Sequence, residues 1–160
     1  MEIEIKEISP SRLEVRELFR LLDEHNMSHC PPEICHLTQP EELENTRSVL
    51  LGVFCDGTLA GMGGLKLKAG YAEITRMFLK PEVRRNGLAV KLLNELEIIA
   101  GNNGRTHLKL ETSEKFEAAY RLYLRYGFQR CEAFGEYVNK AHNAYMEKKV
   151  ALGRSADAPP

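Results

Sequence analysis

The stretch that decides the fold of this chain is Met77-Phe78-Leu79-Lys80-Pro81-Glu82-Val83-Arg84-Arg85-Asn86-Gly87-Leu88-Ala89. Its apolar beginning predicts the end of a strand, and Pro81 predicts where that strand stops. A basic loop with a glycine follows, and apolar residues at helical spacing begin at Leu88. The stretch therefore predicts a strand, a basic glycine loop and the start of a helix in direct succession.

The basic loop has the properties of a phosphate-binding site. Arg84 and Arg85 supply positive charge, and Asn86-Gly87 permits a turn that aims successive main-chain N–H groups at one point. A helix that begins near Leu88 adds its unpaired N–H groups and the positive end of its dipole. The loop therefore predicts a phosphate or pyrophosphate site. An ordinary strand-to-helix turn with a basic pair on the surface fits the same residues.

The rest of the chain predicts one α/β domain over residues 1–150, followed by a disordered tail at residues 151–160. Asp56-Gly57 suits a tight hairpin turn, so three consecutive strands form an antiparallel meander. The order of elements implies a mixed sheet with helices packed against it. Helices are predicted at residues 11–25, 88–100 and 116–126, ended in the last two cases by Gly101 and Gly127, with a short helical turn at 41–47. Strands are predicted at residues 3–8, 49–55, 58–67, 71–79, 107–112, 128–134 and 143–150.

Periodicity also predicts which side chains share a face. Strict alternation along residues 71–79 places Glu73 with Thr75 and Met77, opposite Ile74 and Phe78. On the helix that begins at Leu88, the apolar side chains form one stripe. The polar side chains expected mainly on its other side are those of Lys91, Asn94, Glu95 and Glu97.

Composition limits the partners of this chain. Its 160 residues carry a net charge of -1, so bulk attraction to nucleic acid or to an anionic membrane is not expected. No apolar run is long enough to span a bilayer, and the N-terminus has no apolar core of signal-peptide length. The four cysteines are then expected to be free thiols, and the cytoplasm is the default location. Both a monomer and a homodimer stay open.

A metal site is considered and not expected. The candidate ligands are irregularly spaced and interrupted by two prolines, whereas structural zinc sites use tight pairs. The alternative is a loop that contacts a substrate through His29, Glu33 and His36. The candidate zinc ligands are His25, His29, Cys30, Cys35 and His36. Phosphate signatures of nucleotide triphosphatases and of nicotinamide dehydrogenases are also absent, which leaves those two classes unsupported.

Three ordered elements point to one family. Residues 84–89 fit the pattern (R/Q)-x-x-G-x-(G/A), Glu73-Ile74 opens the preceding strand, and Leu122-Tyr123-x-x-x-Gly127-Phe128 follows at a matching distance. In these elements the chain resembles the GCN5-related N-acetyltransferases over residues 71–128. Two more elements resemble the family's small bacterial type: Pro31-Pro32-Glu33, and Gly135-Glu136-Tyr137 followed by Met146-Glu147-Lys148.

The resemblance implies a mostly antiparallel twisted sheet flanked by helices, with acetyl-coenzyme A as the cosubstrate. It implies that main-chain groups of Met77, Phe78 and Leu79 pair with the pantetheine arm, much like an added strand. It further implies that the loop holds the pyrophosphate through Arg84, Arg85, Asn86, Gly87, Leu88 and Ala89.

The resemblance also implies catalytic roles. Tyr123 corresponds to a tyrosine that donates a proton to the leaving sulfur, and Glu73 to a glutamate that serves as general base in several members. A core aromatic and an exposed strand carboxylate are the alternatives for these two residues. Phe116 replaces an asparagine that contacts the cofactor arm in many members, so packing on the cofactor is expected instead. Relatives often have a serine where this chain has Asn143.

The expected activity is direct transfer of an acetyl group to a primary amine of a small molecule or an amino acid. His29, Glu33 and Tyr137 are the candidate acceptor contacts. A protein N-terminal or lysine acetyltransferase stays open, as does a silent module that binds acyl-coenzyme A and regulates a partner.

Overall fold

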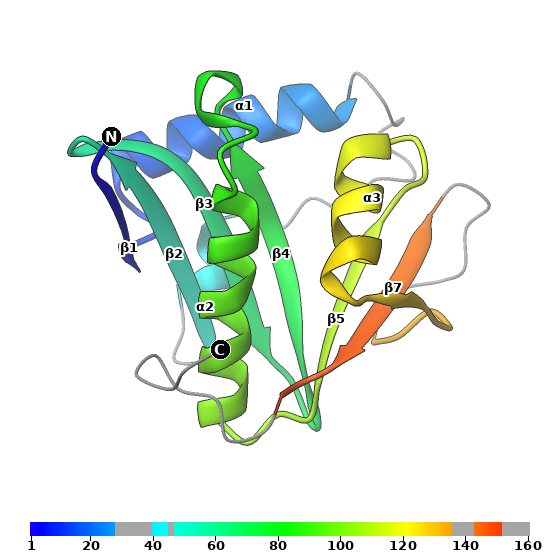
Figure 1. Ribbon diagram of the computed structural model, residues 1–160. Coiled ribbons are helices and arrows are strands. Elements are labelled where there is room, and N and C mark those ends of the chain that lie inside the picture. Colours follow the sequence, from blue (N-terminus) through cyan, green and yellow to red (C-terminus); the bar gives the residue numbers. More distant parts are fainter. Residues whose placement is uncertain (28–39, 45–46, 136–142, 152–160) are drawn as a thin grey trace.

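The computed structural model describes residues 1–27, 40–44, 47–135 and 143–151 and shows one mixed sheet with helices on both faces (Figure 1). The expected α/β fold is therefore confirmed. The helices are α1 (Leu13–Met27), α2 (Leu88–Asn102) and α3 (Glu117–Tyr126), with short 3-10 turns η1 (Pro40–Leu43) and η2 (Pro81–Val83). The strands are β1 (Ile3–Glu7), β2 (Ser48–Cys55), β3 (Thr58–Leu67), β4 (Tyr71–Leu79), β5 (His107–Thr112), β6 (Gln129–Arg130) and β7 (Ala144–Lys149).

The sheet has the order β1-β2-β3-β4-β5-β7-β6, and among the described strands only β4 and β5 pair in parallel. The expected meander of β2, β3 and β4 is present, and Asp56 and Gly57 make its first turn with φ of 50° and 82°. The parallel pairing is short, because it joins only residues 71–73 to residues 107–109. Beyond these residues the two strands diverge, as Figure 1 shows.

Two apolar cores lie on opposite faces of the sheet. One packs the apolar stripe of α2, with Leu92 and Leu96 fully buried, against the sheet together with Tyr123 of α3. The other packs Leu18 and Phe19 of α1 against the opposite face. None of the described helices is long and apolar enough to cross a membrane.

A bulge in β4 overturns the strict alternation expected there. Thr75 pairs with Gly64 and Phe78 with Met62, so two residues of β4 lie opposite the single Gly63. One of the two, Arg76, has a left-handed backbone with φ of 56°. A β-carbon at Gly63 would lie 2.8 Å from the Met77 sulfur, which explains the glycine and shows how closely Met77 packs on β3.

The bulge moves side chains between faces. Met77 packs in the core of α2, on the face of Ile74, and Phe78 packs in the core of α1. Thr75 lies beside Leu43, also on the α1 face. The expectation that Glu73, Thr75 and Met77 share one face was therefore wrong for Met77, because alternation breaks where the extra residue is inserted.

Other expectations were wrong in detail. Gly101 does not end α2, which continues to Asn102, and Gly104 supplies the left-handed residue after it. The strand expected at residues 128–134 is reduced to Gln129–Arg130, and Cys131 follows it half-buried. Cys55 and Cys131 are free thiols, as expected, and burial raises the pKa of both. Cys30 and Cys35 lie outside the described residues.

Glu97 was expected mainly on the polar side of α2, but it is 1% exposed and joins three elements. Its carboxylate accepts hydrogen bonds from Lys148 Nζ of β7 at 2.7 Å, from the Tyr126 hydroxyl of α3 at 2.6 Å and from the main-chain N–H of Ala151 at 3.0 Å. Burial alone would raise the pKa of Glu97, yet these donors lower it overall. The lysine of the closing Met146-Glu147-Lys148 element thus ties β7 to both helices.

We expect Lys148→Met to lower the free energy of unfolding by roughly 3 kcal/mol, because it leaves the buried Glu97 carboxylate without its cation. The pKa of Glu97 is lowered in the folded state, so its stabilising effect is present above pH 4.5 and is lost as the pH falls through the folded-state pKa. Urea unfolding at pH 7 and at acidic pH measures both effects, and the difference between variant and wild type should shrink in acid.

The matched control is Lys149→Met, at the next and exposed position of β7. It should change the free energy of unfolding by no more than about 0.5 kcal/mol. Equal losses in the two variants would show that the Glu97–Lys148 pair does not hold these elements together.

Candidate active site

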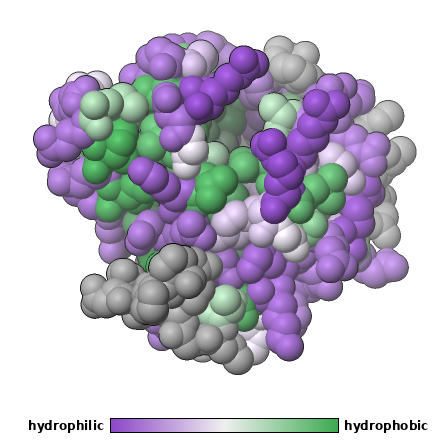
Figure 2. All heavy atoms as spheres, in the orientation of Figure 1, coloured by the Kyte–Doolittle hydropathy of each residue, from purple (hydrophilic) through white to green (hydrophobic). Residues whose placement is uncertain are grey.

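The divergence of β4 and β5 opens a cleft of about 830 Å³. Its walls are the C-terminal halves of the two strands, the start of α2, the inner side of α3 and the end of α1. Figure 2 shows apolar residues gathered in a recess on the face of α2 and α3, with hydrophilic residues along its rim. Both strand ends therefore present their main chain and side chains to one shared space.

Buried polar groups concentrate in this cleft. Five polar or charged residues of the described part are buried, and four of them line the cleft. A polar group removed from water is costly unless it is satisfied, so such a concentration indicates a functional site. These four are Glu73, Arg76, Ser113 and Asn143; the fifth is Glu97.

The loop before α2 has the geometry expected for an anion site. Arg85 and Gly87 both have left-handed backbones, with φ of 66° and 75°, and Gly87 is the N-cap of α2. The N-cap offers no side-chain hydrogen bond to the helix, and the first turn of α2 has no acidic residue. Its N–H groups and the positive dipole end thus remain available to an anion.

The individual loop residues divide into two groups. Arg84, Arg85, Gly87, Leu88 and Ala89 line the cleft. Asn86, which was expected to contact the cofactor, is not among the lining residues, and its side-chain amide braces the turn by donating to the main-chain oxygen of Val83 at 3.2 Å.

Arg84 also braces the end of the strand. Its Nε donates to the main-chain oxygen of Leu79 at 2.7 Å, and its guanidinium lies 5.5 Å from the centre of the Phe78 ring. Arg84 therefore fixes the junction of strand and loop. Met77, Phe78 and Leu79, whose main-chain groups were expected to pair with a pantetheine arm, line the cleft.

Tyr123 faces the cleft from α3 and is 7% exposed. Its ring packs edge-on against Phe128 at 5.7 Å, so the Gly127-Phe128 element holds the ring in place. Gly127 ends α3 with φ of 120°, which lets the chain turn back under the helix. Burial raises the pKa of Tyr123 to about 12, so the hydroxyl keeps its proton at neutral pH. Tyr123 is thus a core aromatic residue that also lines the cleft.

Glu73 enters the same cleft from β4 and is 5% exposed. The alternative of an exposed strand carboxylate is therefore wrong. Glu73 is the last residue of β4 that pairs with β5, so its side chain stands where the two strands begin to separate.

Phe116 lines the cleft at the N-cap of α3, on the opposite side from Glu73. Its ring stacks on that of His25, with centroids 6.0 Å apart and an interplanar angle of 27°. The pair joins the last turn of α1 to the start of α3. Phe116 and His25 therefore form one stacked aromatic pair that lines the cleft, a contact that the sequence did not predict.

Sequence reasoning missed several residues that line the cleft. Arg76 lies in the bulge, where alternation does not predict the direction of a side chain, and nothing in the neighbouring sequence indicates a buried arginine. Ala118, Leu122 and Arg125 recur at i, i+4 and i+7 on α3, a spacing that could have indicated a shared face. Ser113 and Lys115 precede α3. The candidate acceptor contacts His29, Glu33, Tyr137 and His36 lie outside the described residues.

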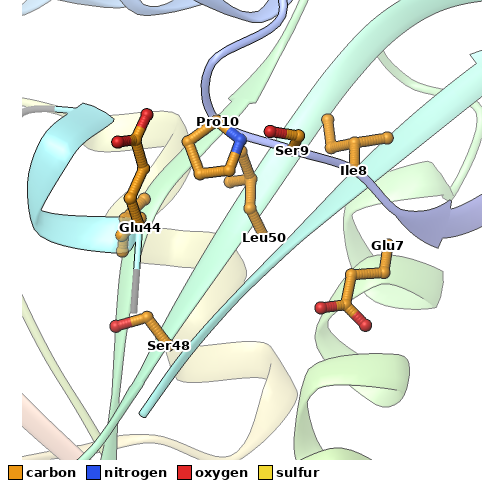
Figure 3. Close-up of a pocket in the computed structure, with 8 residues that line it drawn as sticks. Glu7, Ile8, Ser9, Pro10, Glu44, Ser48 and Leu50 are labelled. Atoms are coloured by element: carbon orange, nitrogen blue, oxygen red, sulfur yellow. The ribbon is translucent and has the colours of Figure 1, made fainter. Parts of the chain in front are cut away.

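A second hollow, of about 530 Å³, lies between the end of β1, η1 and the start of β2 (Figure 3). It shares no lining residue with the cleft. The carboxylates of Glu7 and Glu44 lie on either side of Leu50 and do not converge on one point. This hollow therefore offers no arrangement of groups suited to catalysis.

Comparison with known proteins agrees with this geometry. Residues 13–128 match the family described as Acetyltransferase (GNAT) family. The N-acetyltransferase YsnE of Bacillus subtilis is 33% identical over 141 residues, covering 84% of this chain and 93% of that protein. An IAA acetyltransferase of Azospirillum brasilense is 30% identical over 144 residues, covering 89% of this chain and 94% of that protein.

A solved structure has the same fold. The PaiA N-acetyltransferase of Thermoplasma acidophilum, in complex with coenzyme A, superposes with a TM-score of 0.76 and 27% identity, covering 93% of this chain and 99% of that one. The match of fold, cleft and motifs shows that the chain belongs to the acetyltransferase (GNAT) family and is an enzyme of the N-acetyltransferase class.

Proposed function

We propose that this enzyme transfers the acetyl group of acetyl-coenzyme A directly to a primary amine of a small molecule or an amino acid. The observation that carries the proposal is the cleft between β4 and β5, which has an anion-binding loop at one end and buried Glu73 and Tyr123 farther in. The coenzyme A complex of PaiA supports the cosubstrate, and the acceptor named for the Azospirillum relative supports a small molecule as the acceptor.

The residues present fit the cosubstrate. A β-carbon at Gly87 would meet no heavy atom within 4 Å, so the space in front of this glycine is open. Arg85 and the N–H groups at the start of α2 would hold the pyrophosphate. Register pairing of β4 with β5 ends at Glu73, and the strand edge at Met77 and Leu79 toward β5 would take the pantetheine arm. Acetyl-coenzyme A supplies the activated acetyl group as a thioester.

Tyr123 would act on the leaving group. When the amine nitrogen bonds to the thioester carbon, the carbon–sulfur bond breaks and the sulfur leaves with the electron pair. The Tyr123 hydroxyl gives its proton to that sulfur, and the second proton of the amine nitrogen returns to the Tyr123 oxygen, directly or through water. Its raised pKa keeps the proton in place until the thiolate, a stronger base than the thioester sulfur, develops.

Glu73 would act on the acceptor. An amine enters the site mostly as an ammonium ion and must lose a proton before it can attack. Glu73 stands where β4 and β5 separate and takes this proton, directly or through a water. The bulge at Arg76 and Met77 interrupts the register with β3 past the last pairing with β5, and main-chain N–H groups there would stabilise the charge on the thioester oxygen.

The acceptor would approach from the side of α1. His25 and Asn26 line the cleft there, and α1 leads into the segment with His29 and Glu33. We assign His29, Glu33 and Tyr137 to acceptor binding.

The direct test is release of coenzyme A thiol from acetyl-coenzyme A in the presence of single amines. The panel should include polyamines, free amino acids, aromatic amines and short peptides with a free N-terminus. Turnover with a small amine supports the proposal, whereas turnover with peptides alone would make the enzyme a protein acetyltransferase. Tight binding of coenzyme A without turnover on any amine would indicate a silent regulatory module.

Gly87→Glu should weaken coenzyme A binding about 100-fold or more, because it places a carboxylate against the pyrophosphate. Isothermal titration with coenzyme A measures the effect. The control is Gly104→Glu, which has the same φ of 75° and equally open space but does not line the cleft. Unchanged affinity in Gly87→Glu would remove the loop from the cosubstrate site.

Tyr123→Phe should lower kcat about 100-fold or more while changing the Kd of coenzyme A by less than about threefold, as expected for loss of a general acid. Tyr120→Phe, three residues earlier on α3 and outside the lining of the cleft, is the control. A normal kcat in Tyr123→Phe would show that the hydroxyl takes no part in the rate-limiting step.

A further inference from the structure

The residue at the bulge of β4 is conformationally unusual. Arg76 has φ of 56°, a region that costs a residue other than glycine roughly 1–2 kcal/mol. Strained residues of this kind persist only where their surroundings hold them, and they gather at functional sites. The contacts that hold Arg76 in this conformation therefore bear on how the site works.

Two side chains of α1 hold the guanidinium of Arg76. Its Nη1 lies 2.6 Å from Oδ1 of Asp23, and the guanidinium carbon lies 4.8 Å from the centre of the Phe19 ring. The arginine side chain is 3% exposed and that of Asp23 is 28% exposed, so water screens the pair weakly. We call Arg76, Asp23 and Phe19 the bulge clamp.

The bulge clamp lies at the site of chemistry. Arg76 lines the cleft, three residues after Glu73 and directly before Met77. β4 has its last partner in β5 at Glu73, and Arg76 and Met77 have no register partner in β3. The regular register of the sheet is thus interrupted here, and the ion pair with α1 adds a contact from outside the sheet.

We propose that Arg76, through its ion pair with Asp23, is a positioning residue for acetyl transfer. The clamp fixes the left-handed backbone at the bulge, so that the main-chain groups of Arg76 and Met77 face the thioester carbonyl. This inference rests on the proposed function. A purely structural ion pair would stabilise α1 on the sheet without affecting the bound thioester.

The test uses acetyl-coenzyme A labelled with ¹³C at the acetyl carbonyl, and it needs no acceptor. Bound to the wild type, the carbonyl stretch should move to lower wavenumber than in solution, because main-chain groups polarise it. In Asp23→Asn, which removes the charge at nearly constant shape, at least half of this shift should be lost. In the amine assay, kcat should fall about 10- to 100-fold, as expected for a small misplacement of the reacting groups.

The matched control is Glu24→Gln, the next residue of α1. Glu24 pairs with Arg20 on the exposed side of the helix, so this variant removes one carboxylate charge from α1 without touching the bulge. It should keep the full carbonyl shift and the wild-type kcat. The Kd of coenzyme A should stay within about threefold of wild type in both variants, since the phosphates bind elsewhere.

Arg76→Gly removes the bulge clamp but still permits the left-handed backbone, because glycine adopts positive φ freely and has no side chain to bind Asp23. It should lose the carbonyl shift as Asp23→Asn does, provided that circular dichroism shows a folded protein. A full shift in either variant would overturn the positioning role, as would a wild type that binds acetyl-coenzyme A without any shift. A wild type that binds no acetyl-coenzyme A would instead overturn the proposed function and this inference with it.

Discussion

The short parallel pairing of β4 with β5 is the constraint on which the rest of the structure depends. Main-chain pairing joins the strands at residues 71–73 and 107–109 and then stops. Past that point each strand has an edge that no neighbouring strand fills, and the sheet opens into a cleft. The described candidate groups that line the cleft stand on the diverging strands, or on the loop or helix that follows each strand.

A cleft through the middle of a sheet needs support from outside the sheet, because hydrogen bonds no longer join its two halves there. On one face, Glu97 of α2 binds Lys148 of β7 and Tyr126 of α3, so the helices that flank the cleft share a buried charge network. On the other face, Asp23 of α1 holds Arg76 at the bulge. The two ion pairs thus act on opposite sides of the opening, and both join segments more than 50 residues apart.

The local sequence pattern was enough to predict those helices and strands whose periodicity is strong. The meander, the helix that begins at Leu88 and the strand at residues 107–112 follow from alternation, from helical spacing and from the turn chemistry of Asp56-Gly57. The local sequence pattern did not predict the position of a side chain where a contact with a residue far away in the sequence determines it. Glu97 looks like a surface residue until Lys148 is placed beside it. The bulge at Arg76 adds one residue to β4, so the side chains that follow it point to the opposite faces from those that alternation predicts. The amino-acid sequence around Arg76 does not indicate this extra residue. The chemistry of the loop residues and a family motif, not periodicity, single out the loop and Tyr123 as candidates. The roles of these residues stay predictions, as do the acceptor contacts at His29, Glu33 and Tyr137.

On the proposed function, coenzyme A binds in the opening between β4 and β5. Hydrogen–deuterium exchange of the wild type, with and without saturating coenzyme A, tests it most directly. We expect slower exchange in the segments 75–79, 85–90 and 116–123, which contain residues that line the cleft, and unchanged exchange at residues 7–10 and 48–50 around the second hollow. Binding without slower exchange at residues 75–79 and 85–90, or with slower exchange only around the second hollow, would contradict it.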